Sequence, residues 1–378
     1  MNSCNHRIYL DNNATTAIAP EVKEAMLAVM DLPLNPSSIH ANGQNARRLL
    51  DDAREKLLSA LTSPADTRAI FTSSGTEANN LFLRGVLPAD SDLFISAIEH
   101  SSLRFAADEW PERVSFLPVD TNCVIDLAVL EENLRKKKSP FWVSVMAANN
   151  ETGAIQPLAE IAEITKKHGG FLHVDATQAI GKIPFSLQDF SIDACTISAH
   201  KFSGPQGAGA LLMNKKHQLL PLIRGGGQER GFRSGTENVL AIVGFGAALN
   251  QLEKYRSVIS KTENLRDDFE SRIANLAGEE IIIAKRAKRL PNTSCVRMPG
   301  VRQETQLINF DLAKISVSAG SACSSGKVTP SAVLLAMGLS QDQAAESIRV
   351  SFGVNSSKDD VEAAVYVWAE LWRRTSSR

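Results

Sequence analysis

The segment "TISAHKFSGPQGAGALL" runs from Thr196 to Leu212 and places Ser198, His200 and Lys201 between two apolar runs. It predicts a buried strand, a polar cluster, a turn rich in glycine and proline, and a second buried strand. Lysine is rarely buried without a function, and a lysine in such a site often has a depressed pKa and forms a Schiff base. The alternative is a lysine whose stem packs under a loop while its ammonium reaches water. The segment therefore predicts a sheet whose edge carries a candidate reactive lysine.

On both sides of this segment, apolar strand-like runs alternate with helical patterns from about residue 20 to residue 215. We expect buried strands rich in Val, Ile, Phe and Ala at 68–73, 91–97, 141–148, 170–176, 194–199 and 209–213. Helical periodicity predicts helices at 21–30, 43–61 and 158–169. This alternation is typical of an α/β fold with a mostly parallel sheet that helices cover on both faces.

The pattern changes from about Glu237. A long helical pattern at 237–255 leads into short strand-like runs at 280–284, 293–298 and 315–319, followed by C-terminal helices. This texture predicts a smaller α+β domain, and 378 residues leave room for two domains at roughly 150 residues each. We place the large domain at 15–255 and the small domain at 1–14 together with 256–378.

Composition excludes several classes of protein. The chain is 43% hydrophobic and 22% charged, as in ordinary globular proteins, and its net charge of -1 argues against a nucleic-acid binder. The five cysteines form no C-x-x-C pair or Cys/His cluster, so neither a zinc site nor a disulfide framework is expected. The N-terminus lacks the apolar core of a signal peptide, and no apolar run approaches the roughly 20 residues that span a membrane. We therefore expect a cytoplasmic protein with reduced thiols.

Two motifs follow predicted strands, at the edge where open α/β sheets bind ligands. In "FTSSGTEANN" (71–80), the N–H groups of a helix start and the hydroxyl of Thr76 suit a phosphate, although taken alone the stretch favours an ordinary N-cap. In "HVDATQAIG" (173–181), Asp175 could cap the next helix or pair with the protonated ring nitrogen of a heteroaromatic cofactor. Both interpretations of Asp175 remain open.

Three further motifs carry candidate residues. His100 in "SAIEHSSL" would usually be structural, but its position at the same edge as Lys201 favours a function. The glycines of "IRGGGQERGFRSGTEN" (223–238) permit close approach to a ligand or a partner subunit, and they also suit a long surface turn. Arg349 lies inside the apolar run "ESIRVSFG" and needs a partner, either the carboxylate of a ligand or an internal salt bridge.

The stretch "SVSAGSACSSGK" (316–327) surrounds Cys323 with glycine, serine and alanine. A cysteine that packs in a core usually lies among apolar residues, because free cysteine behaves as a small hydrophobe. The composition therefore predicts a mobile loop that carries a functional thiol.

These motifs together resemble the fold-type I enzymes that depend on pyridoxal 5′-phosphate (PLP), and most closely the cysteine desulfurases of the NifS/IscS type in the class V aminotransferase group. The resemblance extends nearly end to end, through "YLDNNATT" (9–16), "NPSSIH" (35–40), "NNETG" (149–153), "SAGSACSSG" and "SIRVSFG". It implies a large domain with a mostly parallel seven-stranded sheet and a smaller α+β domain. The serines of "EHSSL" stand where other residues are common in the family, and we expect this difference to matter little.

The resemblance implies a role for each candidate residue. Lys201 would hold PLP as a Schiff base, and Asp175 would pair with the ring nitrogen and keep it protonated. His100 would stack on the ring and serve in proton transfer, while Arg349 would clamp the substrate carboxylate. The remaining contacts would come from Gln178 and Asn150 near the ring oxygen, Asn150 also beside the substrate, and Gly75, Thr76, Ser198 and His200 at the phosphate. Thr236 would reach the phosphate held by the partner subunit, which implies a homodimer.

The reaction implied is the conversion of L-cysteine to L-alanine. Lys201 would remove the α-proton, and the Cys323 thiolate would attack the substrate sulfur and become a persulfide, with His100 as the candidate acceptor of the thiol proton. The sulfur would pass to an acceptor protein such as an iron–sulfur scaffold. No metal site is expected, apart from Cys323 as a candidate transient ligand of an iron–sulfur cluster. The alternatives are a selenocysteine lyase, another class V aminotransferase or lyase, and a cofactor-free scaffold protein that has kept the fold.

Overall fold

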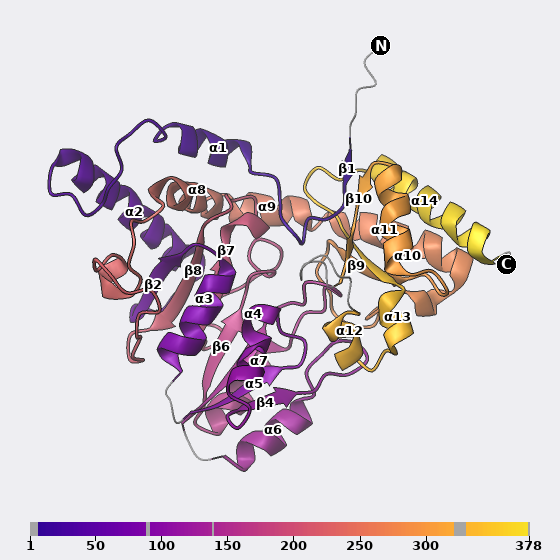
Figure 1. Cartoon of the computed structure of the whole chain (residues 1–378), viewed down its shortest axis with the longest axis horizontal. Coiled ribbons are helices and arrows are strands. Elements are labelled where there is room, and N and C mark those ends of the chain that lie inside the picture. The colour runs from indigo at the N-terminus through magenta and orange to yellow at the C-terminus, as the bar shows by residue number, and fades with distance from the viewer. Residues whose placement is uncertain (1–6, 88–90, 138–139, 321–329, 377–378) are drawn as a thin grey trace.

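The computed structural model describes residues 7–87, 91–137, 140–320 and 330–376 (Figure 1). Cys323 and residues 321–327 of the predicted loop lie outside the described residues, whereas the first part of that loop, 316–320, is described and contains strand residues. Within the described ranges, no helix is both long and apolar enough to cross a lipid bilayer.

A seven-stranded sheet forms the centre of the larger part of the molecule. Its strands lie in the order β2 (Thr67–Thr72), β8 (Gly209–Asn214), β7 (Ala194–Ser198), β6 (Phe171–Asp175), β5 (Phe141–Met146), β3 (Asp92–Ser96) and β4 (Val114–Leu117). The strands from β7 to β4 are parallel to one another, and only β8 is antiparallel to its neighbours, β2 and β7. The predicted mostly parallel seven-stranded sheet is therefore confirmed.

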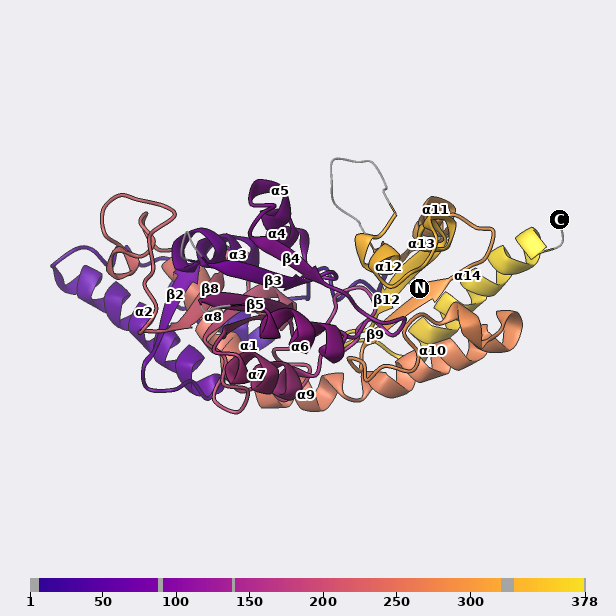
Figure 2. The same ribbon diagram turned by 90° about the horizontal axis from the view of Figure 1, so that it is seen from below.

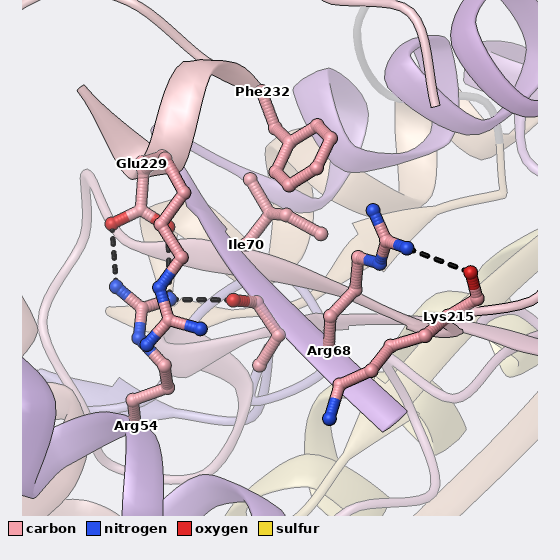
Figure 3. A pocket seen from close by; sticks show the side chains of 8 residues that line it. Arg54, Arg68, Ile70, Lys215, Glu229 and Phe232 are labelled. Atoms are coloured by element: carbon pink, nitrogen blue, oxygen red, sulfur yellow. Dashed lines mark hydrogen bonds and ion pairs between the residues drawn. The ribbon is translucent and has the colours of Figure 1, made fainter. Parts of the chain in front are cut away.

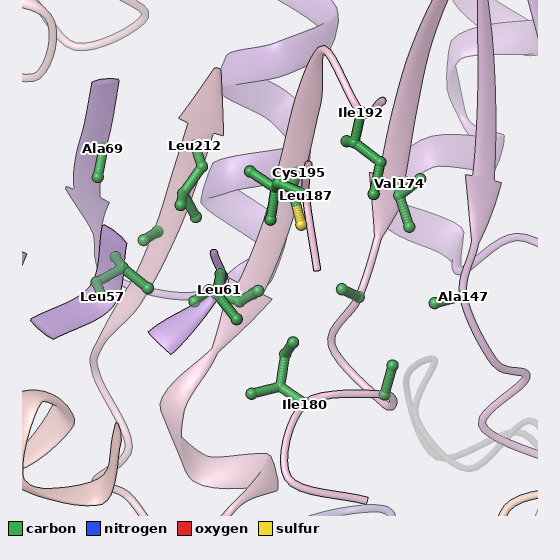
Figure 4. Packing of buried hydrophobic residues seen from close by; sticks show 14 of the residues in the cluster. Leu57, Leu61, Ala69, Ala147, Val174, Ile180, Leu187, Ile192, Cys195 and Leu212 are labelled. Carbon is green, nitrogen blue, oxygen red and sulfur yellow. The ribbon is translucent and has the colours of Figure 1, made fainter. Parts of the chain in front are cut away.

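Alternate residues of these strands face two apolar layers. Ala69 and Phe71 pack with α2 (Ala41–Ala60), α7 (Leu158–Lys167) and α8 (Val239–Leu249). Ile70, between them, packs with α3 (Gly75–Leu81) and α4 (Ser101–Arg104) on the other face. Figure 2 shows α3 and α4 on one side of the sheet and α7 and α8 on the other. The larger layer is a continuous core that includes Leu57 of α2 and Leu212 of β8 (Figure 4).

The smaller part has its own core. Strands β11 (Ser318–Ala319), β12 (Ser347–Ser351) and β9 (Thr293–Arg297) form an antiparallel sheet, and β1 (Ile8–Tyr9) pairs in parallel with β10 (Ile315–Ser316). Phe269 of α10 (Thr262–Ala277), Phe310 of α11 (Gln303–Leu312) and Trp368 of α14 (Lys358–Ser376) are completely buried in this core. Leu10, next to β1, joins the same core, so the N-terminal strand packs with segments of the C-terminal third.

The structure corrects some expected elements. The run 280–284 is not a strand: η4 (Glu279–Ile281) is a 3-10 turn that follows Gly278 at φ 90°, and only Ile282 makes a β-bridge, to Val296. The pattern at 237–255 is two helices, α8 and α9 (Leu252–Ile259), with a break at 250–251. The all-apolar α8 is buried nearly all round, whereas α9 is amphipathic, so one straight helix would not serve both environments. Strand β4 was not predicted, because it lies at the sheet edge and two of its four residues are exposed.

Three short helices complete the part of the fold that lies near the candidate site. Helix α1 (Pro20–Leu27) packs on α8. Helices α12 (Ala332–Ala336) and α13 (Gln341–Ala345) follow the segment that contains Cys323. Ser331 caps α12 by accepting a hydrogen bond from the backbone N–H of Leu334 at 3.1 Å, which fixes the start of this helix.

Candidate active site

The carboxyl ends of the parallel strands carry most of the candidate residues. Strand β6 ends on Asp175, and β7 ends on Ser198 and continues into the 3-10 turn η2 (Ala199–Lys201). His100 follows β3 and caps α4. Asn79 donates hydrogen bonds to both Asp175 and Ser102, and Oγ of Ser102 lies 2.7 Å from Nδ1 of His100, so hydrogen bonds connect the His100 ring to the Asp175 carboxylate. The sheet therefore gathers Asp175, His100 and Lys201 at one edge.

Asp175 is buried, and its two carboxylate oxygens accept different donors. Oδ1 accepts the backbone N–H of Thr177 at 3.0 Å, and Oδ2 accepts Nδ2 of Asn79 at 2.9 Å. The alternative offered by the sequence, that Asp175 caps the next helix, is wrong, because residues 177–182 form turns rather than a helix. A carboxylate has about four acceptor positions, so one contact at each oxygen leaves capacity for a ring N–H.

Lys201 does not extend into solvent. Its Nζ donates to the backbone carbonyls of Asn13 and Ala14, both at 2.7 Å. Two carbonyl acceptors suit an ammonium group, so this position stabilises the protonated amine. The segment around Asn13 therefore lies directly against the candidate reactive lysine.

Two histidines of the site are held neutral by their surroundings. Burial lowers the pKa of His100, although Asp175 raises it and Lys201 lowers it further. Burial and the nearby charge of Lys201 lower the pKa of His200 to about 4, and its Nδ1 lies 3.1 Å from Oγ1 of Thr15. At neutral pH both rings therefore act as hydrogen-bond partners rather than as cations.

Gln178 lies beside the lysine through a hydrogen-bond network that the sequence did not predict. Its Nε2 donates to the carbonyl of Asn13 at 3.0 Å, and its Oε1 accepts Nζ of Lys182 at 2.5 Å. Lys182 also donates to Oδ1 of Asn13 at 2.9 Å. One hydrogen of the Gln178 amide is therefore used within the protein, and the second is left for another acceptor.

Arg349 is buried with two partners. Its Nη1 donates to the carbonyl of Asn150 at 2.9 Å, and its Nη2 lies 2.6 Å from Oδ1 of Asp11. The internal salt bridge offered as an alternative is thus present in the structure. Nε of Arg349 is buried and has no hydrogen-bond partner in the described part of the chain.

The start of α3 lies beside the end of β7. A Cβ added at Gly75 would lie 3.4 Å from Cβ of Ser198 and 3.4 Å from Oγ1 of Thr177. Within the described ranges, no hydrogen bond engages the hydroxyls of Thr76 and Ser198. Thr236 is exposed, three residues after Arg233, which forms an ion pair with Glu77 of α3 at 2.9 Å.

These residues fit PLP by their chemistry. Lys201 offers an amine for the aldehyde, and Asp175 offers an acceptor for a protonated ring nitrogen. The unengaged hydroxyls of Thr76 and Ser198, next to the helix start, are donors of the kind that phosphate oxygens accept. The set therefore matches an aromatic aldehyde that carries a phosphate.

A separate cavity of about 200 Å³ lies elsewhere, and none of the candidate residues lines it. Its wall contains the ion pair of Arg54 with Glu229, with N–O distances of 2.8 and 2.9 Å (Figure 3). Glu229 also accepts the backbone N–H of Phe71 at 2.9 Å. Through these contacts Glu229 joins the turn at 229–231 to β2. We therefore interpret the charged residues around this cavity as structural rather than catalytic.

The two ends of the segment that carries Cys323 meet at one buried carboxyl group. Glu151 accepts a hydrogen bond from Oγ of Ser331 at 2.5 Å, and a Cβ added at Gly320 would lie 2.0 Å from Oε2 of Glu151. Glu151 follows Asn150, whose carbonyl holds Arg349. In the described ranges, no group of three or more His, Cys, Asp and Glu residues is placed to hold a metal ion.

Several of these positioning residues escaped the sequence interpretation. Asn13, Asn79 and Ser102 lie inside the quoted motifs "YLDNNATT", "SSGTEANN" and "EHSSL", but nothing in the sequence shows which group an amide or hydroxyl will contact. Lys182 follows Gln178 by one helical turn, a spacing that places two side chains on the same side. That spacing was the one available signal.

Comparisons with known proteins agree with the geometry. The family described as aminotransferase class-V matches residues 8–364. The cysteine desulfurase IscS of Dictyoglomus turgidum is 38% identical, over 94% of this chain and 91% of that protein. A solved NifS-like protein from Rickettsia africae has a TM-score of 0.90 and 38% identity, covering 97% of this chain and all (100%) of the other. A structure of SspA in complex with cysteine has a TM-score of 0.78 and 29% identity, covering 93% and 100%.

The matched residues span both the seven-stranded sheet and the smaller core, so the similarity covers the fold as a whole rather than one motif. The chain therefore belongs to the class V aminotransferase family and, within it, to the cysteine desulfurases of the NifS/IscS type, as its motifs predicted.

Proposed function

We propose that this enzyme uses PLP bound at Lys201 to convert L-cysteine to L-alanine and that it transfers the sulfur to Cys323. The observation that carries the proposal is the convergence of Lys201, Asp175 and His100 at one sheet edge, with Arg349 joined to the same segment through the carbonyl of Asn150. An amine, a carboxylate and a stacked ring are the groups that a PLP enzyme needs around its cofactor. PLP, when bound, supplies the electron sink that makes the α-proton of an amino acid acidic.

The other cofactor contacts follow from the positions described. Gln178 has one amide hydrogen left for the ring oxygen, and Asn150 lies on the side of Arg349. Gly75, Thr76, Ser198 and His200 would surround the phosphate, with Thr236 supplied across a dimer. Lys201, once released, would rest against the carbonyls of Asn13 and Ala14, where the proton taken from the substrate is stabilised.

The substrate is an amino acid whose carboxylate Arg349 would bind. The planar guanidinium suits bidentate recognition, and its Nε is unpartnered in the described chain. A substrate carboxylate would compete with Asp11 for Nη2. The related SspA structure contains cysteine, which supports L-cysteine as the substrate here.

Cys323 is proposed as the sulfur acceptor on chain-length grounds. It lies three positions after Gly320 in the sequence, and three residue steps span at most about 10 Å. Gly320 lies against Glu151, the neighbour of Asn150, so the segment starts beside the proposed substrate site. The thiolate would attack the substrate sulfur, the carbon–sulfur bond would break, and the electron pair would return to the carbon that becomes the methyl group of alanine.

A homodimer is supported by exposed apolar side chains. These side chains lie in two segments of the sequence. One segment contains Ile18, Leu27, Met30, Leu32 and Ile39, and the other contains Leu220, Leu222 and Ile223. Exposed apolar clusters of this kind usually mark an interface. Sedimentation at micromolar concentration should give a mass near twice 41.0 kDa, and a monomer would contradict the dimer.

We also propose that the persulfide sulfur passes to an acceptor protein, such as an iron–sulfur scaffold, in the cytoplasm. A persulfide-forming thiol requires a compartment that keeps thiols reduced. A pull-down with purified scaffold proteins, in which the transfer of labelled sulfur is measured, tests the acceptor. This test is separate from the release of sulfur from L-cysteine.

The purified protein should be yellow and should release alanine and sulfane sulfur in equal amounts from L-cysteine. Cys323→Ala should keep the cofactor absorbance and lose persulfide formation, while Cys123→Ala, which removes a buried thiol, should retain both. Full desulfuration by Cys323→Ala would contradict the tethered nucleophile. Selenocysteine turnover that survives Cys323→Ala would instead indicate a selenocysteine lyase, and a colourless protein would indicate a scaffold.

A further inference from the structure

Asn79 connects two residues of the proposed cofactor site, although neither motif nor family assigned it a role here. It is completely enclosed, with 1% of its surface exposed. Its Nδ2 donates to Oδ2 of Asp175 and to Oγ of Ser102, both at 2.9 Å. Both hydrogens of the amide are therefore used.

The orientation of this amide is determined by charge. Turned the other way, Oδ1 would face a carboxylate oxygen of Asp175, and two acceptors would repel each other. In the observed orientation, Oδ1 is buried without a partner in the described chain. An orphaned buried acceptor is costly, so its presence indicates that the two donations of Asn79 outweigh that cost.

The donation from Asn79 fixes the direction of the next hydrogen bond. Ser102 accepts a hydrogen from Asn79, so its own hydroxyl hydrogen is free to point at the next group. That group is Nδ1 of His100, which lies 2.7 Å from Oγ of Ser102. The backbone N–H of Ser102 also points at Nδ1, at 3.1 Å, as the cap of α4.

Two donors thus converge on Nδ1 of His100, and a nitrogen that accepts cannot carry a hydrogen. The neutral ring must therefore carry its hydrogen on Nε2. A proton added at Nδ1 would oppose both donors and remove the cap of α4.

We propose that Asn79 and Ser102 are positioning residues that hold His100 as the neutral Nε2–H tautomer and connect that tautomer to the carboxylate of Asp175. The proposal rests on the proposed function only for the identity of the bound cofactor. It assigns a role to a serine of "EHSSL" that was expected to matter little. It also changes the expected role of His100: the neutral ring offers a hydrogen-bond donor at Nε2, and its basic nitrogen is occupied by Ser102.

The charged groups around the ring do not provide the same control. Asp175 on β6 favours the charged ring, and Lys201 on η2 opposes it. Glu99 directly precedes His100 in the sequence, and Arg104 is the last residue of α4, the helix that His100 caps. Burial, followed by the charge of Asp175, raises the pKa of Glu99 well above its ordinary value, which weakens its effect as an anion on the ring. Opposing charges leave the directional hydrogen bonds as the feature that selects one nitrogen.

Nitrogen NMR of the holoenzyme tests the proposal directly. The chain contains seven histidines, so ¹⁵N-histidine labelling gives few signals, and the loss of one signal in His100→Gln assigns the ring. The wild-type ring should show a protonated Nε2 and a hydrogen-bonded, unprotonated Nδ1 at neutral pH. A hydrogen on Nδ1 would overturn the proposal without any variant. Because the shifts are read from the ring itself, this result is independent of whether L-cysteine is the substrate.

The variants test the two positioning residues. Ser102→Ala should raise the pH at which the ring protonates by about one unit, since one hydrogen bond that stabilises the neutral form is lost. Asn79→Ala should shift it in the same direction and should also move the pH dependence of the cofactor absorbance, because Asp175 loses a donor. The matched controls are Ser101→Ala and Asn80→Ala, which alter exposed or outward-facing neighbours of the same types. The proposal would be overturned if the His100 ring of both test variants became protonated at the same pH as in the wild type.

Discussion

Nζ of Lys182 lies 2.5 Å from Oε1 of Gln178, so a buried lysine holds the amide that is proposed to contact the cofactor ring. The contact determines which end of the amide is the donor. Because Oε1 accepts from Lys182, Nε2 must face Asn13 and the cofactor side. A second lysine near Lys201 is therefore part of the site, although it takes no direct part in the proposed reaction.

Lys182→Met should destabilise the protein at alkaline pH by about 1–3 kcal/mol, because Oε1 of Gln178 loses its donor in a buried position. Burial, followed by the charges of Lys201 and Arg349, holds the pKa of Lys182 well below its ordinary value of 10.5. Between that lowered pKa and 10.5 the unfolded chain binds a proton that the folded chain does not, so wild-type stability rises with pH. The variant lacks this rise, and its deficit should shrink as the pH falls.

Urea unfolding of the two proteins at several pH values between 6 and 10 measures the difference. Lys254→Met, which removes an exposed lysine paired with Glu21, is the control and should show little change at any pH. A deficit that is equal at all pH values would contradict the lowered pKa, although it would leave the hydrogen bond to Gln178 intact as a finding.

Asp11→Asn should lower the KM for L-cysteine several-fold with little change in kcat. The carboxylate of Asp11 lies 2.6 Å from Nη2 of Arg349, where the substrate carboxylate is proposed to bind. Removing the competing charge strengthens the attraction of Arg349 for the substrate. Steady-state kinetics beside Arg349→Lys, which should raise the KM by at least tenfold because the bidentate fork is lost, provide the comparison. A higher KM in Asp11→Asn would show that Asp11 orients the arginine instead.

Gly320→Ala should destabilise the protein, because the added Cβ would lie 2.0 Å from Oε2 of Glu151. The carboxyl group cannot move away freely, since it is buried and hydrogen-bonded to Ser331. In a double-mutant cycle, Glu151→Ala removes the obstacle, so the loss in the double variant should be smaller than the sum of the two single losses. Additive losses would show that Gly320 is required for another reason.

The large sheet and the position of His100, Asp175 and Lys201 at its edge could be predicted, because each rests on a local signal. Apolar runs at the spacing of α/β units predict parallel strands, and the carboxyl ends of such strands converge, so Asp175 and Lys201 had to be neighbours. The run at 280–284 has the composition of a strand, but it lies beside β9 with only one β-bridge. Composition does not show whether a segment has enough hydrogen-bonded neighbours to form a strand. Strand β4 was missed for the opposite reason: it pairs as a strand although its sequence is only partly apolar, because a strand at the sheet edge is partly exposed.

The internal contacts of the site could not be predicted in the same way. Asn13 reaches Lys201, Gln178 and Lys182, which are more than 160 residues distant in sequence. No period or spacing encodes such a contact. The choice for Arg349 between a ligand and an internal salt bridge also needed coordinates, because both interpretations require the same residue in the same strand.

Asp193→Asn should lower the stability of the enzyme at pH 7 by about 3 kcal/mol, and the deficit should disappear in acid. Burial alone would raise the pKa of Asp193, but hydrogen bonds from His217, Lys166 and Lys216 and from the backbone N–H of Leu172 hold it far below the ordinary value. The folded carboxylate therefore contributes stability that is complete above the unfolded pKa of 3.8 and is lost as the pH falls towards the folded pKa. Unfolding midpoints of wild type and Asp193→Asn should thus be well separated at pH 7 and should converge as the pH is lowered below 3.8, for example at about pH 2. Asp189→Asn removes a nearby exposed acid for which no such contacts to lysine or histidine exist in the described chain, and it should match wild type at both pH values. A deficit of Asp193→Asn that persists undiminished in acid would show that the lost contacts act through packing rather than through the charge of the carboxylate.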